Sequence, residues 1–479
     1  MSKTKKNKVK VSFVGTNAEA VTGSSILIES NNKKILIECG LYQGDESLFE
    51  QYKINKRRLP YKVKDIDYLV LLHSHIDHVG LVPRLYKQGA TAKIIAPVGL
   101  KNLFELMTND SAFIMERDAE DLAKKFGRDF EPIYDREDVY KSLMYWNEFE
   151  KNEVVEIDED IKIKFLNSAH IINACQCELW IKNNNRVVKI GITSDLGNIS
   201  IDNDYVADFE PIEKANLLIG EATYSRELKH INNKNRLKDL EKLKTIITQT
   251  CIDNKAKVLI PVFALQRCQT ILTCLYDIFK EEREFNIPII IDSPLAIKIT
   301  EVFLKELEYT QPEDYNKLKA VLQWKNIRFE KEFEGTQMCV SSQEPCVFLS
   351  CSGMMNAGRA VYTASKLLPN SNNYIVFCGY SSEGSLGSKI KNKKQKTVTI
   401  DGKSIPCKCQ VANLLSFSSH MQRQDLLNYY SNGNYDKIAI VHSEFKSKVV
   451  FCKELQELLS KKNKTNKVVC VNKSTEILI

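Results

Sequence analysis

Three histidines and an aspartate crowd one short stretch of this chain, the run LLHSHIDHVG at residues 71–80. The apolar run 68–72 predicts a buried strand, and residues 79–89 predict a helix that Gly89 closes. The chain has only seven histidines, so a chance cluster on a solvated turn is the poorer interpretation. Imidazole and carboxylate groups are the usual ligands of zinc and related metals. We therefore expect a metal site where this strand passes into this helix.

Two further polar residues end apolar runs and are candidates for the same chemistry. His170 ends the run that begins near residue 161, a place where an isolated histidine is usually a core residue. Asp195 follows a strand predicted over 187–193 and precedes Gly197. An unpaired aspartate is costly to bury, and a metal ion would account for one here.

The pattern of predicted elements changes near residue 209. Before it, short strands dominate, together with a charged helical stretch at 99–150. After it, helices predicted over 236–254, 265–283 and 295–308 alternate with strands at 217–224, 256–263 and 288–292. Such alternation favours an α/β unit built on a mainly parallel sheet. Strands return over 397–418, and helices are predicted at 421–431 and 446–461.

Length and composition narrow the class of protein. A chain of 479 residues with 43% hydrophobic content is long enough for two or three domains with large cores. None of the fourteen cysteines forms a CxxC pair, and most lie in apolar runs, as buried reduced thiols do. No run approaches the length of a membrane span. We expect a cytoplasmic protein that does not associate with a membrane. Its net charge of +7 permits a polyanionic substrate without requiring one.

The run HSHIDH matches the H-x-H-x-D-H signature of the metallo-β-lactamase superfamily. Segments at 221–224, 260–267, 291–298, 349–354 and 379–387 resemble the β-CASP part of its nucleases. The chain thus resembles metallo-β-lactamase fold ribonucleases of the β-CASP family, including bacterial and archaeal RNA-processing members and the catalytic subunit that cleaves mRNA 3′ ends. The resemblance implies an α/β fold, an αββα metallo-β-lactamase sandwich with an inserted α/β β-CASP domain. It places the first part of the metallo-β-lactamase domain at 1–208, the β-CASP domain at 209–394 and the second part at 395–479.

The resemblance also implies a set of metal ligands. One zinc is expected on His73, His75 and His170 and the other on Asp77, His78 and His442, with Asp195 bridging the two. Manganese is the alternative ion, because it accepts the same ligands. Glu38 stands where the family has an aspartate that supports a metal-bound histidine from outside the ligand set.

The implied activity is two-metal hydrolysis of RNA phosphodiester bonds in RNA processing or decay. His420 is expected to protonate the leaving oxygen and Glu221 to orient it, and Asp77 belongs to the same catalytic set. In this family a histidine at the position of His442 goes with the RNA-cleaving branches, which favours RNA over DNA. Endonuclease action is the first expectation, with 5′ exonuclease action as the alternative, and a homodimer is one assembly that the sequence allows.

The candidates for substrate contact lie in the second half of the chain. The turn at Ser352 and Gly353 offers backbone N–H groups suited to a phosphate, and Arg267 is a third candidate. The basic run at 391–396 is a candidate contact for an RNA backbone, although a solvated loop is the simpler interpretation.

Three departures from the family pattern concern the substrate side. Gln422 replaces an aspartate, Asn198 replaces a frequent arginine, and Tyr362 lies where many relatives carry histidines. Alternative functions are a DNA nuclease of the same family, a hydrolase of thioesters or lactones, and a non-catalytic binding subunit. The β-CASP-like segments disfavour the small-molecule hydrolase, and the complete ligand set disfavours the non-catalytic subunit.

Overall fold

The computed structural model describes residues 8–44, 46–184, 186–226, 229–379, 384–392 and 396–479. The chain forms two compact units. The first contains the described residues up to Ile199, Val206–His230 and His420–Ile479, and the second contains Ser200–Tyr205 and Ile231–Ser419. The division expected from the sequence placed the two boundaries at 208/209 and 394/395. In the structure the main segment of the second unit is Ile231–Ser419. Residues 214–221 pair with a sheet of the first unit, and residues 410–413 pair with the sheet of the second.

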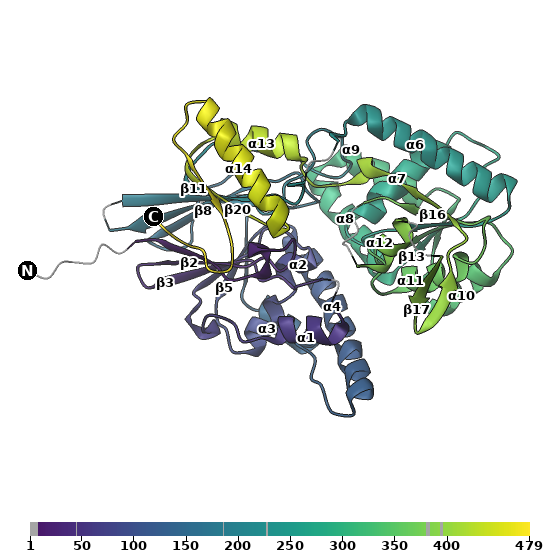
Figure 1. Ribbon diagram of the computed structural model, residues 1–479, viewed down its shortest axis with the longest axis horizontal. Coiled ribbons are helices and arrows are strands. Elements are labelled where there is room, and N and C mark those ends of the chain that lie inside the picture. Colours follow the sequence, from purple (N-terminus) through teal and green to yellow (C-terminus); the bar gives the residue numbers. More distant parts are fainter. Residues whose placement is uncertain (1–7, 45, 185, 227–228, 380–383, 393–395) are drawn as a thin grey trace, which may run out of the picture. The chain divides into compact units, whose positions relative to one another are not determined.

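Two seven-stranded sheets form the centre of the first unit (Figure 1). One sheet has the order β22 (Glu476–Leu478), β1 (Lys10–Phe13), β2 (Ile26–Ser30), β3 (Lys33–Ile37), β4 (Tyr68–Val70), β5 (Lys93–Pro97) and β6 (Trp146–Phe149). The other has the order β21 (Lys467–Cys470), β20 (Asn434–Val441), β11 (Lys214–Glu221), β10 (Arg186–Ile192), β9 (Cys175–Asn183), β8 (Ile161–Asn167) and β7 (Val155–Glu156).

The core between these sheets follows from alternating apolar residues. In β8, Ile161, Ile163 and Phe165 are buried while the residues between them are more exposed. A strand turns successive side chains to opposite faces, so this spacing of two gives β8 one face for the core. Side chains from both sheets, among them Val11 and Leu217, meet there in one cluster.

Helices cover the outer face of each sheet and complete an αββα sandwich (Figure 1). The first sheet is covered by α1 (Leu48–Lys56), α3 (Val82–Lys87), α4 (Leu100–Phe126) and α5 (Arg136–Leu143), and the second by α13 (Arg423–Asn432) and α14 (Phe445–Lys461). The fold class predicted from the sequence is confirmed.

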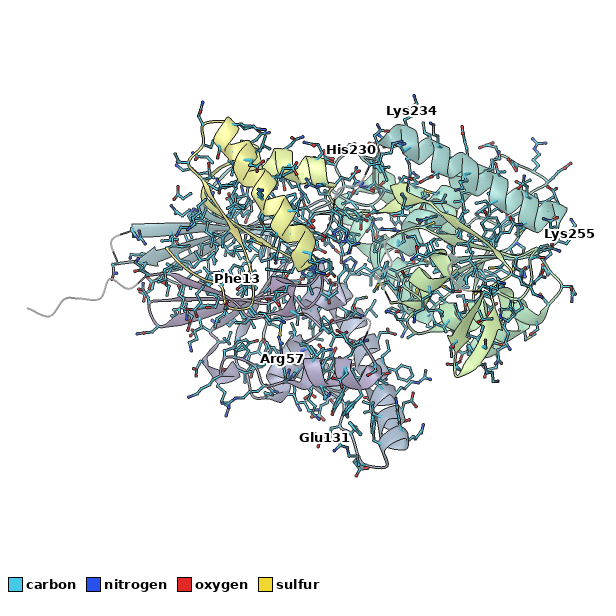
Figure 2. The ribbon with its side chains drawn as sticks, viewed as in Figure 1. Phe13, Arg57, Glu131, His230, Lys234 and Lys255 are labelled. Atoms are coloured by element: carbon cyan, nitrogen blue, oxygen red, sulfur yellow. The ribbon has the colours of Figure 1, made fainter. Side chains whose placement is uncertain are left out.

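The second unit is an α/β domain on a wholly parallel six-stranded sheet. Its order is β14 (Ile327–Phe329), β13 (Ile289–Asp292), β15 (Val347–Ser350), β12 (Val258–Pro261), β16 (Tyr374–Phe377) and β19 (Gln410–Asn413). Its helices are α6 (Asn233–Ile247), α7 (Arg267–Phe279), α8 (Pro294–Thr310), α9 (Pro312–Leu322), α10 (Phe333–Ser341), α11 (Arg359–Leu367) and α12 (Leu386–Lys391), and a hairpin is made by β17 (Thr397–Ile400) and β18 (Lys403–Pro406). Helix α6 runs on as a wider turn over Thr248–Asp253, so Lys234 and Lys255 mark the two ends of a long segment (Figure 2).

The helix after the histidine-rich turn differs from the prediction. Instead of one helix over 79–89, the chain forms α2 (Ile76–Val79) and then α3. The break falls at Leu81, whose N–H donates to the carbonyl of Cys39 rather than to the preceding turn. Gly80 packs so closely that a Cβ there would lie 2.4 Å from the carbonyl oxygen of Ile76. This break ties the histidine-rich turn to the end of β3.

Candidate metal centre

The ends of four strands carry the polar residues that the sequence singled out. His73 and His75 lie in the loop between β4 and α2. Strands β10, β11 and β20 run parallel, so the residues at or beyond their carboxyl ends share one edge of the sheet. Asp195, Glu221 and His442 are those residues, and all of them belong to the first unit.

The first cluster combines His73, His75, His170 and Asp195, whose nearest ligand atoms lie within 4.8 Å of one another. His170 Nε2 is 3.3 Å from His75 Nδ1 and 3.5 Å from Asp195 Oδ2. His73 Nε2 is 3.6 Å from the same carboxylate oxygen. Three imidazoles and one oxygen therefore converge on a single small space.

The second cluster combines Asp77, His78 and His442. Nε2 of His78 is 3.2 Å from Nε2 of His442, and these two atoms lie 3.6 and 3.4 Å from Asp77 Oδ2. The other oxygen of Asp195, Oδ1, is 3.3 Å from His78 Nε2. Asp195 thus presents one oxygen to each cluster, the arrangement of a bridging ligand.

These spacings fit the donor set of zinc. Ligands at about 2.0–2.1 Å around a tetrahedral zinc lie about 3.3–3.4 Å from one another, and the six ligand-atom distances given above within the two clusters are 3.2–3.6 Å. His73 Nε2 and Asp195 Oδ1 are buried and make no hydrogen bond to any residue that the structure describes. Buried polar atoms are rarely left without a partner, and a bound cation would supply one.

Burial keeps the imidazoles of the first cluster neutral. Burial, followed by the nearby His73, lowers the pKa of His75 to about 3. Burial and then the charge of His420 lower the pKa of His170 well below its ordinary value. Burial and the charge of His78 likewise lower the pKa of His73. Neutral imidazole is the form that binds a metal.

In the second cluster the charges of the surrounding carboxylates outweigh the effect of burial on the pKa of His78. Burial alone would lower the pKa of His78, but the charges of Glu38, Asp195 and Asp77 raise it well above its ordinary value. Burial alone would raise the pKa of Asp77, but the charge of His78 and a hydrogen bond from His442 hold it at about 2. A site that stabilises an imidazolium in this way will also stabilise a metal cation, which replaces the proton on the ligand nitrogen.

Glu38 lies directly behind the second cluster and is 2% exposed. Its Oε2 accepts a hydrogen bond of 2.6 Å from Nδ1 of His78, which leaves Nε2 of that ring directed at the cluster. Two serines that the sequence analysis did not single out, Ser24 and Ser194, donate to the same carboxylate at 2.7 Å. The one signal for Ser194 in the sequence was its place immediately before Asp195.

His420 and Glu221 lie beside the clusters without joining them. His420 Nδ1 is 3.9 Å from Glu221 Oε1 and 4.0 Å from Asp195 Oδ2, longer than a hydrogen bond but within side-chain contact. Backbone pairing between His420 and Gly197 holds the histidine next to the Asp195 loop. Glu221 Oε2 accepts a 2.6 Å hydrogen bond from the N–H of Thr223, which fixes the carboxylate.

Two of the departures from the family pattern contact each other. Gln422 Nε2 donates to Asn198 Oδ1 at 3.3 Å, and both side chains are buried. Tyr362 lies in the second unit, where its ring packs edge-on against Phe333.

The candidates for substrate contact also lie in the second unit. Ser352 Oγ makes a long hydrogen bond of 3.4 Å to the carbonyl of Ala357, and Gly353 packs against Phe263. Arg267 is buried and donates to the carbonyl of Cys378. Residues 393–395 of the basic run and 380–383 of the glycine-rich segment lie outside the described residues.

The αββα sandwich and its histidine–carboxylate clusters define a class, the metal-dependent hydrolases. Three family models match in chain order: the metallo-beta-lactamase superfamily at residues 18–150, the Beta-Casp domain at 268–390 and the Zn-dependent metallo-hydrolase RNA specificity domain at 404–469. The chain belongs to the metallo-β-lactamase/β-CASP ribonuclease family, as predicted.

Curated relatives are distant but match over most of the chain. Ribonuclease TTHA0252 of Thermus thermophilus is 26% identical over 89% of this chain and 91% of its own length. Transcription termination factor FttA of Methanocaldococcus jannaschii is 25% identical over 95% of this chain and 70% of its own length. A crystal structure of a protein of unknown function from Enterococcus faecalis is 11% identical, with a TM-score of 0.50 over 98% of this chain and 100% of that one, and it supports the fold alone.

Within the described ranges, each helix is too short or too polar to span a lipid bilayer.

Proposed function

We propose that this protein is a zinc-dependent ribonuclease that hydrolyses phosphodiester bonds within RNA with two metal ions. The observation that carries the proposal is the pair of adjoining clusters that share Asp195, one oxygen facing each. Two-metal sites of this kind suit an in-line displacement at phosphorus. The match to the RNA specificity domain model, and the names of relatives called ribonuclease and transcription termination factor, favour RNA as the substrate.

The proposed ligands form two sets, one for each zinc ion, that match the two clusters. His73, His75 and His170 would hold one zinc, Asp77, His78 and His442 the other, and Asp195 both. When bound, the two ions supply Lewis-acid chemistry, because they neutralise charge that develops on the phosphate and lower the pKa of water at the site. Manganese is the alternative ion for the same donors.

The chain's own contribution to bond cleavage is proton transfer and orientation. The sugar oxygen that leaves a phosphodiester is a poor leaving group unless it gains a proton. His420 is the proposed donor, since it lies beside Asp195 and is partly exposed. Glu221, held by Thr223, would orient the imidazole. The gap of 3.9 Å would close when substrate binds, because catalytic hydrogen bonds are often long in structures without substrate.

Contacts to the rest of the substrate are assigned to the second unit. The backbone at Ser352 and Gly353 is the proposed phosphate contact, and Arg267 is proposed to support the substrate-binding surface from its place beside Cys378. Endonuclease action is proposed first, with 5′ exonuclease action as the alternative.

The test is digestion of RNA and DNA of matched sequence, labelled at the 5′ or the 3′ end, by protein of measured zinc content. We expect internal cleavage of RNA, little cleavage of DNA, loss of activity with a chelator and recovery with added zinc. Release of single nucleotides from the 5′ end would indicate the exonuclease. Intact RNA beside rapid hydrolysis of DNA, a thioester or a lactone would reject the proposal.

A further inference from the structure

A single buried carboxylate contacts histidines of both clusters. Glu38 Oε2 accepts from Nδ1 of His78 at 2.6 Å, and Glu38 Oε1 accepts from the hydroxyl of Ser194 at 2.7 Å. The Nδ1 of His73, which belongs to the other cluster, lies 3.7 Å from Glu38 Oε1, beyond hydrogen-bond distance. It lies 3.1 Å from Ser194 Oγ. The serine hydroxyl therefore fills the gap between this histidine and the carboxylate.

The direction of each hydrogen bond follows from the groups involved. A carboxylate can only accept, so the one proton of the Ser194 hydroxyl is directed to Glu38. The oxygen of that hydroxyl then accepts the proton on Nδ1 of His73. The same logic places a proton on Nδ1 of His78, which donates to Glu38 directly. In the neutral form that binds a metal, both rings are therefore held in the tautomer whose Nε2 lone pair is free for the ion.

The backbone at these positions supports a role for the side chains. Ser194 has φ +49° and Glu38 has φ +58°, in the left-handed region that side-chain-bearing residues adopt at a cost. Glycine adopts this region readily. The serine at position 194 thus adopts a backbone conformation that glycine would adopt at lower cost, which fits a role for its hydroxyl.

We propose that Ser194 is a positioning residue that relays the hydrogen bond of His73 to Glu38, so that one carboxylate orients one metal-binding histidine in each cluster. The inference rests on the proposed metal centre. It requires the two residues to differ in effect. Loss of the Ser194 hydroxyl should lower the zinc affinity of the first cluster alone, whereas loss of the Glu38 charge should lower the zinc affinity of both clusters.

The variant Ser194→Gly tests the relay, because it removes the hydroxyl and at the same time relieves the left-handed backbone. Zinc affinity is measured by competition with a chelator, and the thermal stability of the metal-free protein is measured in parallel. Loss of a group that supports a metal ligand typically weakens binding about 10–100-fold. We expect one zinc of the two to leave at lower chelator concentration by that factor, the other to keep wild-type affinity, and the metal-free protein to melt within a few degrees of wild type.

Two further variants complete the design. Glu38→Gln keeps the side-chain length and should weaken both ions. Ser350→Ala is the matched control, because Ser350 is a buried serine that donates to a carboxylate, Asp292 Oδ2, at 2.8 Å in the second unit. It should leave both zinc affinities unchanged.

Three results would overturn the relay. The first is that Ser194→Gly binds both ions with wild-type affinity. The second is that it binds both ions more weakly by the same factor. The third is that the free energy of unfolding of the metal-free variant falls by as much as its free energy of zinc binding does. None of these readouts uses RNA, so a wild-type protein that binds two zinc ions without cutting RNA would reject the proposed function and leave the relay standing.

Discussion

Replacement of His420 by alanine separates proton donation from metal binding. His420 belongs to neither cluster, and its Nδ1 stays 3.9 Å or more from the carboxylates of Glu221 and Asp195. If it is the general acid, His420→Ala should retain about two zinc ions per chain and bind RNA nearly as wild type does. Cleavage alone should fail.

The size of the effect can be set against the stability of the fold. A general acid contributes about 10²–10⁴-fold in rate, or about 3–5 kcal/mol of barrier at about 1.4 kcal/mol per tenfold. The His420 side chain is 20% exposed and packs with the rings of His170 and Tyr224. Its truncation should lower the free energy of unfolding by about 1 kcal/mol, the typical value for a single substitution. Loss of activity should therefore far exceed loss of folded protein.

The assay is turnover of end-labelled RNA per folded, zinc-loaded molecule, with folding followed by circular dichroism and zinc measured on the same sample. His230→Ala is the matched control, because His230 is a partly exposed histidine of the same unit, 3.2 Å from Asp425 and outside both clusters (Figure 2). It should cut RNA at the wild-type rate. Near-wild-type turnover in His420→Ala, or loss of its zinc, would refute the assignment of the acid.

Two further predictions concern metal retention and the core. Asp195→Ala should carry fewer than two zinc ions after gel filtration, because one carboxylate serves both clusters, and full zinc content measured by elemental analysis would contradict the bridging role. Leu179→Ala, at a fully buried position between the two sheets, should lower the free energy of unfolding by about 2–5 kcal/mol. Replacement of the exposed Val187 by alanine in the same sheet should change the free energy of unfolding by less than about 0.5 kcal/mol. If urea unfolds the two variants at similar concentrations, the assignment of Leu179 to the inter-sheet core is wrong.

The histidine-rich run at 73–78 and Asp195 could be singled out in the sequence because they follow predicted strands, whereas His170 and His442 were assigned as ligands from the resemblance to the family. Polar residues that end apolar runs come together when the strands run side by side, and Asp195 and His442 do so although they are far apart in the chain. The parallel α/β sheet was predicted from the residues for a similar reason, whereas the sandwich was predicted from the resemblance to the family. Alternation of apolar residues and of helices with strands is a local signal with a known architectural outcome.

Other features carried little or no local signal. The place of Ser194 immediately before Asp195 was its one signal, and the role proposed for it depends on contacts with Glu38 and His73, both more than a hundred residues away. The strand β22 has three residues, too few for a pattern, and is specified by its pairing with β1 at the other end of the chain. The break between α2 and α3 depends on the carbonyl of Cys39, a partner that the pattern of residues 76–89 does not contain.

Hydrogen bonds join the beginning and the end of the second unit, and this affects how the chain folds during its synthesis. Ser416, near the end of that unit, accepts from Arg236 and donates to Asp239, near its beginning. Once folded, the unit therefore holds its two ends together and acts in the folding of the first unit as a short connection. Each halving of the effective loop length lowers the entropic cost of closure by about 0.6 kcal/mol. On the ribosome the second unit emerges before His420 and His442, and the set of candidate metal ligands is complete only once His442 has been synthesised. If the protein cleaves RNA as proposed, a nascent chain that still lacks His442 would therefore carry an incomplete set of metal ligands.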